Sequence, residues 1–298
     1  MEKFLSVNTL YKSDPDLKQE DVEMLSKWCD QQKHFPKVLD IQIALALHSC
    51  YYSVEQAKNC LENYFTIRGM VPELFSNGNP DKSAPLKQAM EVNLVSILPQ
   101  RTKENYIVVL AKLMDTNPDL YNPQLASKVF DMQILRHVYT EGPSSGVLVI
   151  IDMTGGVFGH LLKMNLTDFK KFLVYIQDAM PIRLIGVHFI NVVPFMDKIL
   201  ALLKPFIRKE FFSKIFIHTN MDTFYEHVPK EALPVDYGGE ADSVNYQFEK
   251  YKKQIYDNQW FYDFQDTMVV DEGKRVGPRK DADSLFGFDG TFRKLSVD

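Results

Sequence analysis

Apolar and polar positions along residues 147–239 predict strands that are separated by helices. Three runs are short, apolar and rich in β-branched residues, as buried strands are: VLVIID from Val147, RLIGVHFIN from Arg183 and KIFIH from Lys214. The intervals between them are long enough for a helix, which favours βαβ units and a mostly parallel sheet with covered faces. The run YIVVLAKL from Tyr106 predicts the first strand of this sheet, and residues 122–139 predict a helix with Pro123 in its first turn.

The residues before this block have the periodicity of helices. Apolar residues follow the i, i+3, i+4 spacing from Leu17 to Trp28, and two more helices are expected at 39–49 and 54–68, the second capped by Ser53. Gly, Pro, Asn and Ser accumulate from Gly69 onward, which indicates a boundary. We therefore expect a helical domain at 1–80 and an α/β domain at 81–250.

The C-terminal residues, 251–298, are expected to pack on the body of the protein. Helical periodicity continues over 240–265, and the final part is mixed in charge. Disordered tails are usually poor in aromatic residues. This tail instead carries Leu285, Phe286, Phe288, Phe292 and Leu295.

The segment PFMDKILALLKPF, from Pro194, predicts an amphipathic helix. At 100° per residue one arc carries the apolar side chains of Phe195, Met196, Ile199, Leu200, Leu202 and Leu203, with Asp197, Lys198 and Ala201 opposite. Two interpretations remain open. Either this arc of apolar side chains packs permanently in the core, or the helix is a lid over an apolar cavity and docks on membranes when it opens.

Composition narrows the class of protein. The 298 residues carry a net charge of −5, which argues against a dedicated nucleic-acid binder. The N-terminus lacks the features of a signal peptide, and no stretch reaches ~18 uncharged apolar residues. Three cysteines, Cys29, Cys50 and Cys60, have no metal-binding spacing and fit reduced thiols. We expect a cytoplasmic protein.

No motif predicts catalysis, a cofactor or a metal. The segment IIDMTGGVFGH resembles a dinucleotide loop, but Thr154 stands where the first glycine is needed, so a tight turn is the better interpretation. There is no GxSxG, and the histidines at 137, 160, 188, 218 and 227 lack zinc-type spacing. The sequence therefore predicts that the chain is not an enzyme.

Two polar residues on the helix predicted at 122–139 could contact a ligand. Gln133 and His137 are four residues apart, close to Phe130 and Ile134. Such groups orient the hydroxyl or carbonyl end of an apolar ligand, although a surface or internally satisfied pair would give the same pattern.

Basic residues are concentrated beside the amphipathic helix. Over 183–215 there are six basic and two acidic residues; the basic ones are Arg183, Lys198, Lys204, Arg208, Lys209 and Lys214. This surplus indicates either attraction to an anionic membrane or an ordinary solvated face.

Several segments together resemble the CRAL-TRIO lipid-binding family. SVEQAKNCLENYFTIRGMVPELF is similar to the end of the family's helical N-terminal domain. GVLVIIDMTGG, QDAMPIRLIGVHFIN, LKPF and LPVDYGG are similar to successive parts of its lipid-binding domain, and GTFRKLSVD resembles the ending of insect members. The resemblance implies a sheet-floored apolar pocket that is closed by a gate helix.

The resemblance also implies functional residues. By position, the pocket would include Phe130, Gln133, His137, Val147, Val149, Ile151, Phe172, Tyr175, Ile176, Met180, Ile182, Leu184 and Val187. The gate would use Phe195, Met196, Ile199, Leu200 and Leu203. Tocopherol-binding members also hold phosphoinositide head groups, and Arg183 and Lys214 match two of their basic positions, whereas Ile185 and Glu210 replace two others. Lys204, Arg208 and Lys209 are further candidates for membrane contact.

These observations lead to two functional hypotheses. The first is a monomeric cytoplasmic carrier that encloses a retinoid, carotenoid, tocopherol or other isoprenoid-like lipid and exchanges it at membranes. The alternative is a membrane adaptor that responds to a phospholipid or phosphoinositide. A hydrolase would require a Ser/His/acid cluster that the sequence does not suggest.

Overall fold

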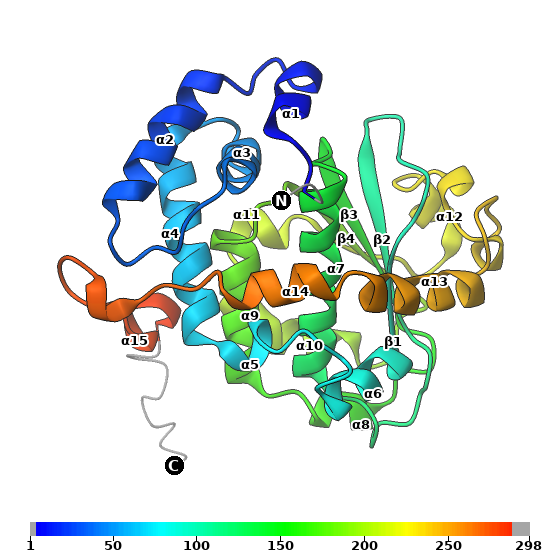
Figure 1. The fold of residues 1–298 in the computed structure, drawn as a ribbon. Coiled ribbons are helices and arrows are strands. Elements are labelled where there is room, and N and C mark those ends of the chain that lie inside the picture. Colours follow the sequence, from blue (N-terminus) through cyan, green and yellow to red (C-terminus); the bar gives the residue numbers. More distant parts are fainter. Residues whose placement is uncertain (1–3, 288–298) are drawn as a thin grey trace, which may run out of the picture.

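The computed structural model describes residues 4–287, which form a helical region followed by an α/β region (Figure 1). The helical region has six helices among the described residues: α1 (Val7–Ser13), α2 (Gln19–Gln31), α3 (Asp40–Ser49), α4 (Val54–Met70), α5 (Pro72–Phe75) and α6 (Ala84–Val92). The side chain of Ser53 accepts the backbone N–H of Gln56 at the start of α4, which confirms the predicted cap.

A five-stranded sheet forms the centre of the α/β region. Its strands are β1 (Asn93–Ile97), β2 (Tyr106–Leu113), β3 (Gly146–Asp152), β4 (Leu184–Ile190) and β5 (Ile215–Ile217), side by side in that order. β1 is antiparallel to β2, and the other pairs are parallel, so the predicted mostly parallel sheet is confirmed. The prediction that the sheet begins at Tyr106 is wrong, because β1 follows α6 directly, without the turn residues that usually mark a strand.

Helices alternate with the parallel strands. They are α7 (Pro123–Thr140), α8 (Phe158–Leu162), α9 (Leu166–Asp178), α10 (Met196–Leu203), α11 (Lys209–Phe212) and α12 (Met221–Tyr225), followed by α13 (Val244–Asp257), α14 (Gln259–Asp266) and α15 (Ala282–Phe286). Asn122 and Asn165 cap α7 and α9 with their side chains. The helix predicted over 240–265 is two helices, which meet at Asn258.

The two faces of the sheet have different neighbours. One face carries a row of paired residues from four neighbouring strands: Ser96, Leu110, Ile150 and His188. There the hydroxyl of Ser96 is 3.1 Å from Gln247 of α13, and the ring of His188 is 6.2 Å from that of Phe224 in α12. α7 and α9 lie on the other side of the strands, between the sheet and the helical region (Figure 1).

A bulge in β4 decides which of its first residues face α7 and α9. Val147 pairs with Leu184, but Leu148 pairs with Gly186, so Ile185 is an extra residue. A Cβ atom on Gly146 would lie 2.1 Å from the side chain of Ile185. Since side chains alternate along β3, Ile185 is on the face of Gly146, and Leu184 is on the opposite face with Val147 and Val187.

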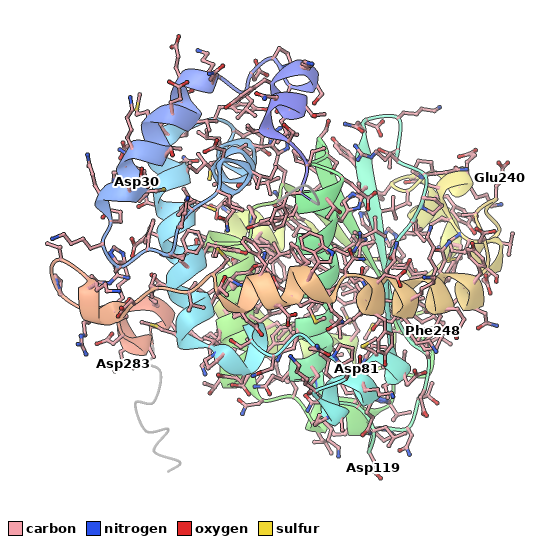
Figure 2. The ribbon with its side chains drawn as sticks, viewed as in Figure 1. Asp30, Asp81, Asp119, Glu240, Phe248 and Asp283 are labelled. Atoms are coloured by element: carbon pink, nitrogen blue, oxygen red, sulfur yellow. The ribbon has the colours of Figure 1, made fainter. Side chains whose placement is uncertain are left out.

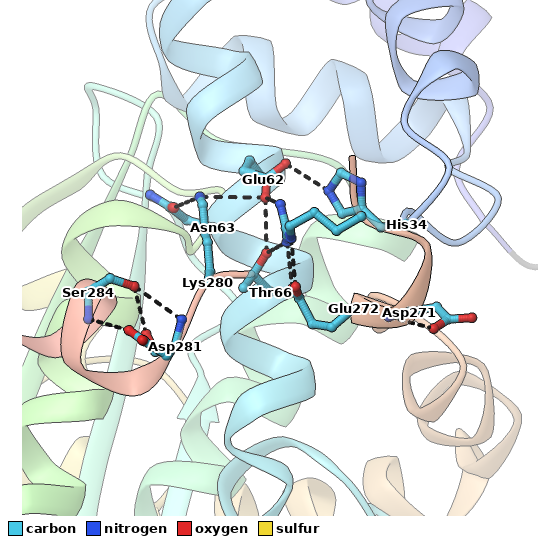
Figure 3. A network of polar contacts seen from close by, with 11 residues as sticks. His34, Glu62, Asn63, Thr66, Asp271, Glu272, Lys280, Asp281 and Ser284 are labelled. Carbon is cyan, nitrogen blue, oxygen red and sulfur yellow. Dashed lines mark hydrogen bonds and ion pairs between the residues drawn. The ribbon is translucent and has the colours of Figure 1, made fainter. Parts of the chain in front are cut away.

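The C-terminal part of the chain crosses α4 and ends against α9. Arg275 is bonded to Glu62 and Thr66 of α4 and to Glu272, and His34 also contacts Glu62 (Figure 3). Phe286 of α15 is buried, whereas the predicted contacts of Phe288, Phe292 and Leu295 lie outside the described residues.

Charged side chains mark the periphery of the molecule, as in an ordinary water-facing surface. Asp30, Asp81, Asp119, Glu240 and Asp283 are all exposed; in Figure 2, Asp119, Glu240 and Asp283 lie at the edge of the view.

Candidate ligand-binding site

An apolar strip at the centre of the sheet is only partly covered. Along β4 the buried residues alternate with Val187 and Phe189, which stay partly exposed although neighbouring strands flank them on both sides. Ile151 of β3 pairs with Phe189 and is also partly exposed. These three side chains lie on the face of the sheet that is covered by α7 and α9. The strip can therefore contact an apolar molecule without unfolding of the sheet.

The helices opposite this strip contribute aromatic and aliphatic groups. Phe130 of α7 and Phe172 of α9 meet edge to face, with ring centroids 6.2 Å apart. Ile176 of α9 is partly exposed, and Met180 is buried just beyond the end of α9. Ile182 follows, immediately before β4.

Tyr175 lies in a different environment from the other residues expected in the pocket. Its hydroxyl donates to the carboxylate of Asp131 at 2.7 Å and lies 3.3 Å from Arg68 of α4. The ring is completely buried between α9 and the helical region. Tyr175 therefore joins the two regions of the chain. Its partners Asp131 and Arg68 are 44 and 107 positions away, and no local pattern indicates these contacts.

Gln133 and His137 are buried on α7 at 1% and 6% exposure. Among residues 4–287, neither the amide nitrogen of Gln133 nor Nε2 of His137 has a hydrogen-bond partner. Buried polar groups in folded proteins are nearly always paired. Two such groups one turn apart therefore indicate a missing polar partner.

The helix α10 has few ties to the body of the protein. Only Met196 and Leu203 are buried, while Phe195, Ile199 and Leu200 remain partly exposed. Among the described elements α10 packs extensively only against the short 3₁₀ turn Lys204–Phe206 that continues it. That turn is attached to α9, because the side-chain amide of Gln177 donates to the carbonyl of Phe206 at 3.2 Å. Leu202, at the edge of the predicted apolar arc, is exposed.

An exposed apolar patch lies on and beside α8, next to α10. The helix α8 was not predicted from the sequence. Val157, Phe158, Leu162 and Leu166 are all exposed. Phe158 contacts the ring of Phe195 at 5.5 Å, and the ammonium group of Lys198 lies over Phe158. Grouped apolar side chains of this kind, next to a cation, are typical of surfaces that bind membranes or proteins.

The predicted membrane-contact residues fall into two groups. Arg183 donates to the backbone carbonyl of His48 at 2.7 Å and stacks on Tyr51, and Lys214 donates to the carbonyl of Leu184 at 2.6 Å. These two cations are partly buried and hold the protein together.

The second group is accessible. Arg208 is exposed, with Asp178 2.5 Å away. Lys204 and Lys209 are exposed, and neither forms an ion pair within residues 4–287. In this second group Lys204 and Lys209 can offer their charge to a surface, whereas the charge of Arg208 is paired with Asp178.

A separate polar cleft of about 550 Å³ lies at the carboxyl ends of β2, β3 and β4. Asp152 at its base accepts hydrogen bonds from Lys112, Thr154, Asn191 and Tyr237. Burial alone would raise the pKa of Asp152, but these bonds together lower it to about 2. The carboxylate therefore stays ionised and joins the strand ends to the loop that carries Tyr237.

The glycine-rich segment after β3 is a turn, as predicted. Gly155 has φ +78°, and a Cβ atom there would lie 2.2 Å from Thr116.

Within residues 4–287 no cluster of three or more His, Cys, Asp or Glu side chains could hold a metal ion. No helix in the same part of the chain is long and apolar enough to cross a membrane.

Comparisons with known proteins identify the family. The CRAL/TRIO domain model matches residues 92–239, and the Pinta-like UBA domain model matches residues 14–84. The human alpha-tocopherol transfer protein-like protein is 24% identical over 237 residues, which cover 78% of this chain and 68% of that protein. Mouse clavesin-1 is 23% identical over 249 residues, which cover 79% of this chain and 69% of clavesin-1.

Among solved structures, the crystal structure of Sfh5 aligns with a TM-score of 0.44 and 13% identity, over 82% of this chain and 99% of that one. The family matches, rather than this alignment, decide the assignment. Residues 92–239 form a CRAL/TRIO domain, and the family predicted from the sequence is confirmed.

Proposed function

We propose that this protein binds one hydrophobic small molecule between the sheet and helices α7 and α9, and that α10 is the lid of this site. The observation that carries the proposal is the partly exposed apolar strip of Ile151, Val187 and Phe189 in the middle of the sheet. Removing a few hundred Å² of apolar surface from water, at ~25 cal/mol per Å², would stabilise the complex by several kcal/mol.

The walls of the site that we propose come from two strands, β3 and β4, and from α7, α9 and the segment after α9. Its walls would be Val147, Val149, Ile151, Leu184 and Val187 on the strands, and Phe130, Phe172, Ile176, Met180 and Ile182 on or beside the helices. Its lid would be Phe195, Met196, Ile199, Leu200 and Leu203. The printed name of the human relative refers to alpha-tocopherol transfer, which favours an isoprenoid-like lipid as the cargo.

Exchange of the ligand at a membrane is the second part of the proposal. The exposed patch on α8 borders the lid through the contact of Phe158 with Phe195. Lys204 and Lys209 follow the lid in sequence and are exposed. An apolar patch next to cations would dock on an anionic bilayer and bring the lid to the lipid phase.

The adaptor alternative, with recognition of a phosphoinositide head group, has less support. Arg183 and Lys214 already donate to backbone carbonyls, so a phosphate would have to compete with these bonds. We therefore favour the carrier.

The proposal is tested by native mass spectrometry of the purified protein, followed by organic extraction and identification of any bound molecule. A Val187→Trp variant would fill the strip and is expected to lose the bound mass. The matched control is Val276→Trp, because Val276 is 81% exposed and distant from the sheet in sequence. A protein that stays empty from several expression hosts, and also after incubation with lipid vesicles, would contradict the proposal.

A further inference from the structure

Two of the three cysteines meet where α3 ends and α4 packs against it. Cys50 is the residue that follows α3, and Cys60 lies in the first half of α4, ten positions further along the chain. Their thiol groups interact directly. The thiol of Cys60 also donates to the carbonyl of Ala179, just beyond α9, at 3.3 Å. The fold therefore creates a pair of thiols that the spacing of the cysteines does not indicate.

The two thiols differ in access to solvent. Cys50 is partly exposed, whereas Cys60 is buried at 7% exposure. A small oxidant can therefore reach Cys50, while the protein shields Cys60. An accessible thiol with a second thiol beside it is the arrangement of redox-sensing cysteines.

The guanidinium group of Arg183 lies among the neighbours of Cys50 in the chain. It donates to the carbonyl of His48 at 2.7 Å and lies over the rings of Tyr51 and Tyr52, at 4.3 and 5.2 Å from their centroids. Its Nη2 atom is buried and has no hydrogen-bond partner within residues 4–287. A cation with a free donor next to a thiol favours the thiolate, which is the form that reacts with oxidants.

The acidity of the thiols differs in the direction that such a reaction needs. The interaction with Cys60 is the main cause that lowers the pKa of Cys50, and the charge of Arg183 acts in the same direction, although burial opposes both. The same interaction, together with burial, raises the pKa of Cys60 well above its ordinary value. Burial raises the pKa of Cys29 to about 12. Cys50 is therefore the first of the three thiols to ionise.

We infer that Cys50 is an oxidation site, and that hydrogen peroxide converts Cys50 and Cys60 into an intramolecular disulfide. The thiolate of Cys50 attacks one oxygen of the peroxide, which breaks the O–O bond, forms a sulfenic acid and releases hydroxide. The sulfur of Cys60 then attacks the sulfur of Cys50, and the hydroxyl group leaves as water with the thiol proton of Cys60. The two thiols lose two electrons in total, and the peroxide is reduced to two molecules of water.

The disulfide changes the attachment of α4 to the end of α9. Cys60 loses its thiol proton in the reaction, so the carbonyl of Ala179 loses its donor. A dithiol reductant restores both thiols and this hydrogen bond. The oxidation state of Cys50 is therefore linked to a contact between the helical region and the CRAL/TRIO domain.

The first test uses the reduced full-length protein and a slight excess of hydrogen peroxide. The intact protein is expected to lose the mass of two hydrogen atoms, and peptide mapping without reductant should find Cys50 joined to Cys60. Cys29 is the internal control and should stay a thiol that is alkylated only after unfolding. An unmodified Cys50, a stable sulfenic acid or a disulfide between two molecules would overturn the inference.

A variant without the second thiol separates the two steps of the reaction. In Cys60→Ser, Cys50 is expected to stop at the sulfenic acid, which dimedone traps, and the loss of two hydrogen atoms should disappear. Cys29→Ser is the matched control and should form the disulfide as the unaltered protein does. Circular dichroism checks the fold of both variants; if Cys60→Ser does not fold, the peptide map of the unaltered protein decides alone.

The part played by Arg183 is tested by the rate of the first step. Arg183→Gln is expected to slow the oxidation of Cys50 by roughly tenfold, as a rise of one unit in the pKa of its thiol would. Lys214→Gln is the matched control, because Lys214 is another partly buried cation that donates to a backbone carbonyl, that of Leu184. Equal rates in the two variants would overturn the assignment of Arg183.

Discussion

The guanidinium group of Arg68 lies 2.8 Å from the carboxylate of Asp131, and both side chains are almost completely buried. The pair joins α4 of the helical region to α7 of the CRAL/TRIO domain. The hydroxyl of Tyr175 donates to the same carboxylate, so three helices meet at one anion. The helical region is therefore attached at the back of the proposed ligand site.

Breaking this ion pair is expected to destabilise the whole protein. Asp131→Ala leaves a buried guanidinium without its anion, and such single changes cost about 3–5 kcal/mol. The measurement is the free energy of unfolding in urea. An Arg68→Met/Asp131→Leu variant, which removes both charges, should recover much of the loss; equal destabilisation by the single and double changes would show that the pair has no special role.

A charge on the inner side of α10 is expected to impair the lid. We expect Ile199→Asp and Phe195→Asp to slow transfer of a fluorescent ligand from the protein to vesicles, by roughly tenfold, because closing or inserting the helix would bury a carboxylate. Ala201→Asp is the control, since Ala201 is exposed on the same helix. Equal rates for Ile199→Asp and Ala201→Asp would contradict a lid.

The exposed patch on α8 should contribute to membrane docking. Leu162 is 72% exposed, and Leu162→Glu removes an apolar group of the kind that adds ~1.5–3 kcal/mol when it is fully buried. We expect at least a severalfold weaker affinity for anionic vesicles in a sedimentation assay. Val276→Glu, the same type of change at a valine that is 81% exposed, should have no effect on docking.

His188 should make the folded state less stable as the pH falls below neutrality. Burial, together with the nearby His218 and His227, lowers the pKa of His188 to about 3. The unfolded chain binds this proton near pH 6.5 and the folded chain does not. Stability that is present above pH 6.5 is therefore lost as the pH falls toward 3, at up to ~1.4 kcal/mol per pH unit.

The measurement for His188 is the urea-unfolding free energy between about pH 7 and pH 5.5, above the range in which most carboxylates titrate. His188→Asn should flatten the slope over this interval. The ring stacks on Phe216 with centroids 4.7 Å apart, so the variant is also expected to be less stable at every pH. An unchanged slope would contradict the assignment.

Strong local patterns in the sequence were enough to predict much of this fold. The apolar runs at Val147 and Arg183 and the capped helix at Ser53 were correctly predicted, because each carries its own signal in consecutive residues. β1 was missed, since its five residues continue the apolar pattern of α6 without a break. α8 was missed because its glycine-rich approach indicated only a turn.

Long-range pairings could not be predicted in the same way. Nothing near Tyr175 indicates that its hydroxyl binds Asp131, and nothing near Arg183 indicates that it donates to the carbonyl of His48 at the end of α3. Gln133 and His137 were recognised as polar residues among apolar ones. That both are buried without partners was visible only in the folded chain.

The bulge in β4 also links two positions that are distant in sequence. A side chain at position 146 would collide with Ile185, the extra residue of the bulge. If Ile185 were deleted, Leu184 would still pair with Val147, and the space beside Gly146 would open. A Cβ atom at 146 would also lie 2.9 Å from the ring of Tyr106. Glycine at 146 should therefore covary among homologues with both positions: chains that keep the inserted residue at 185 are restricted to glycine, whereas chains that lack it can carry alanine at 146 where the residue at 106 is smaller or displaced.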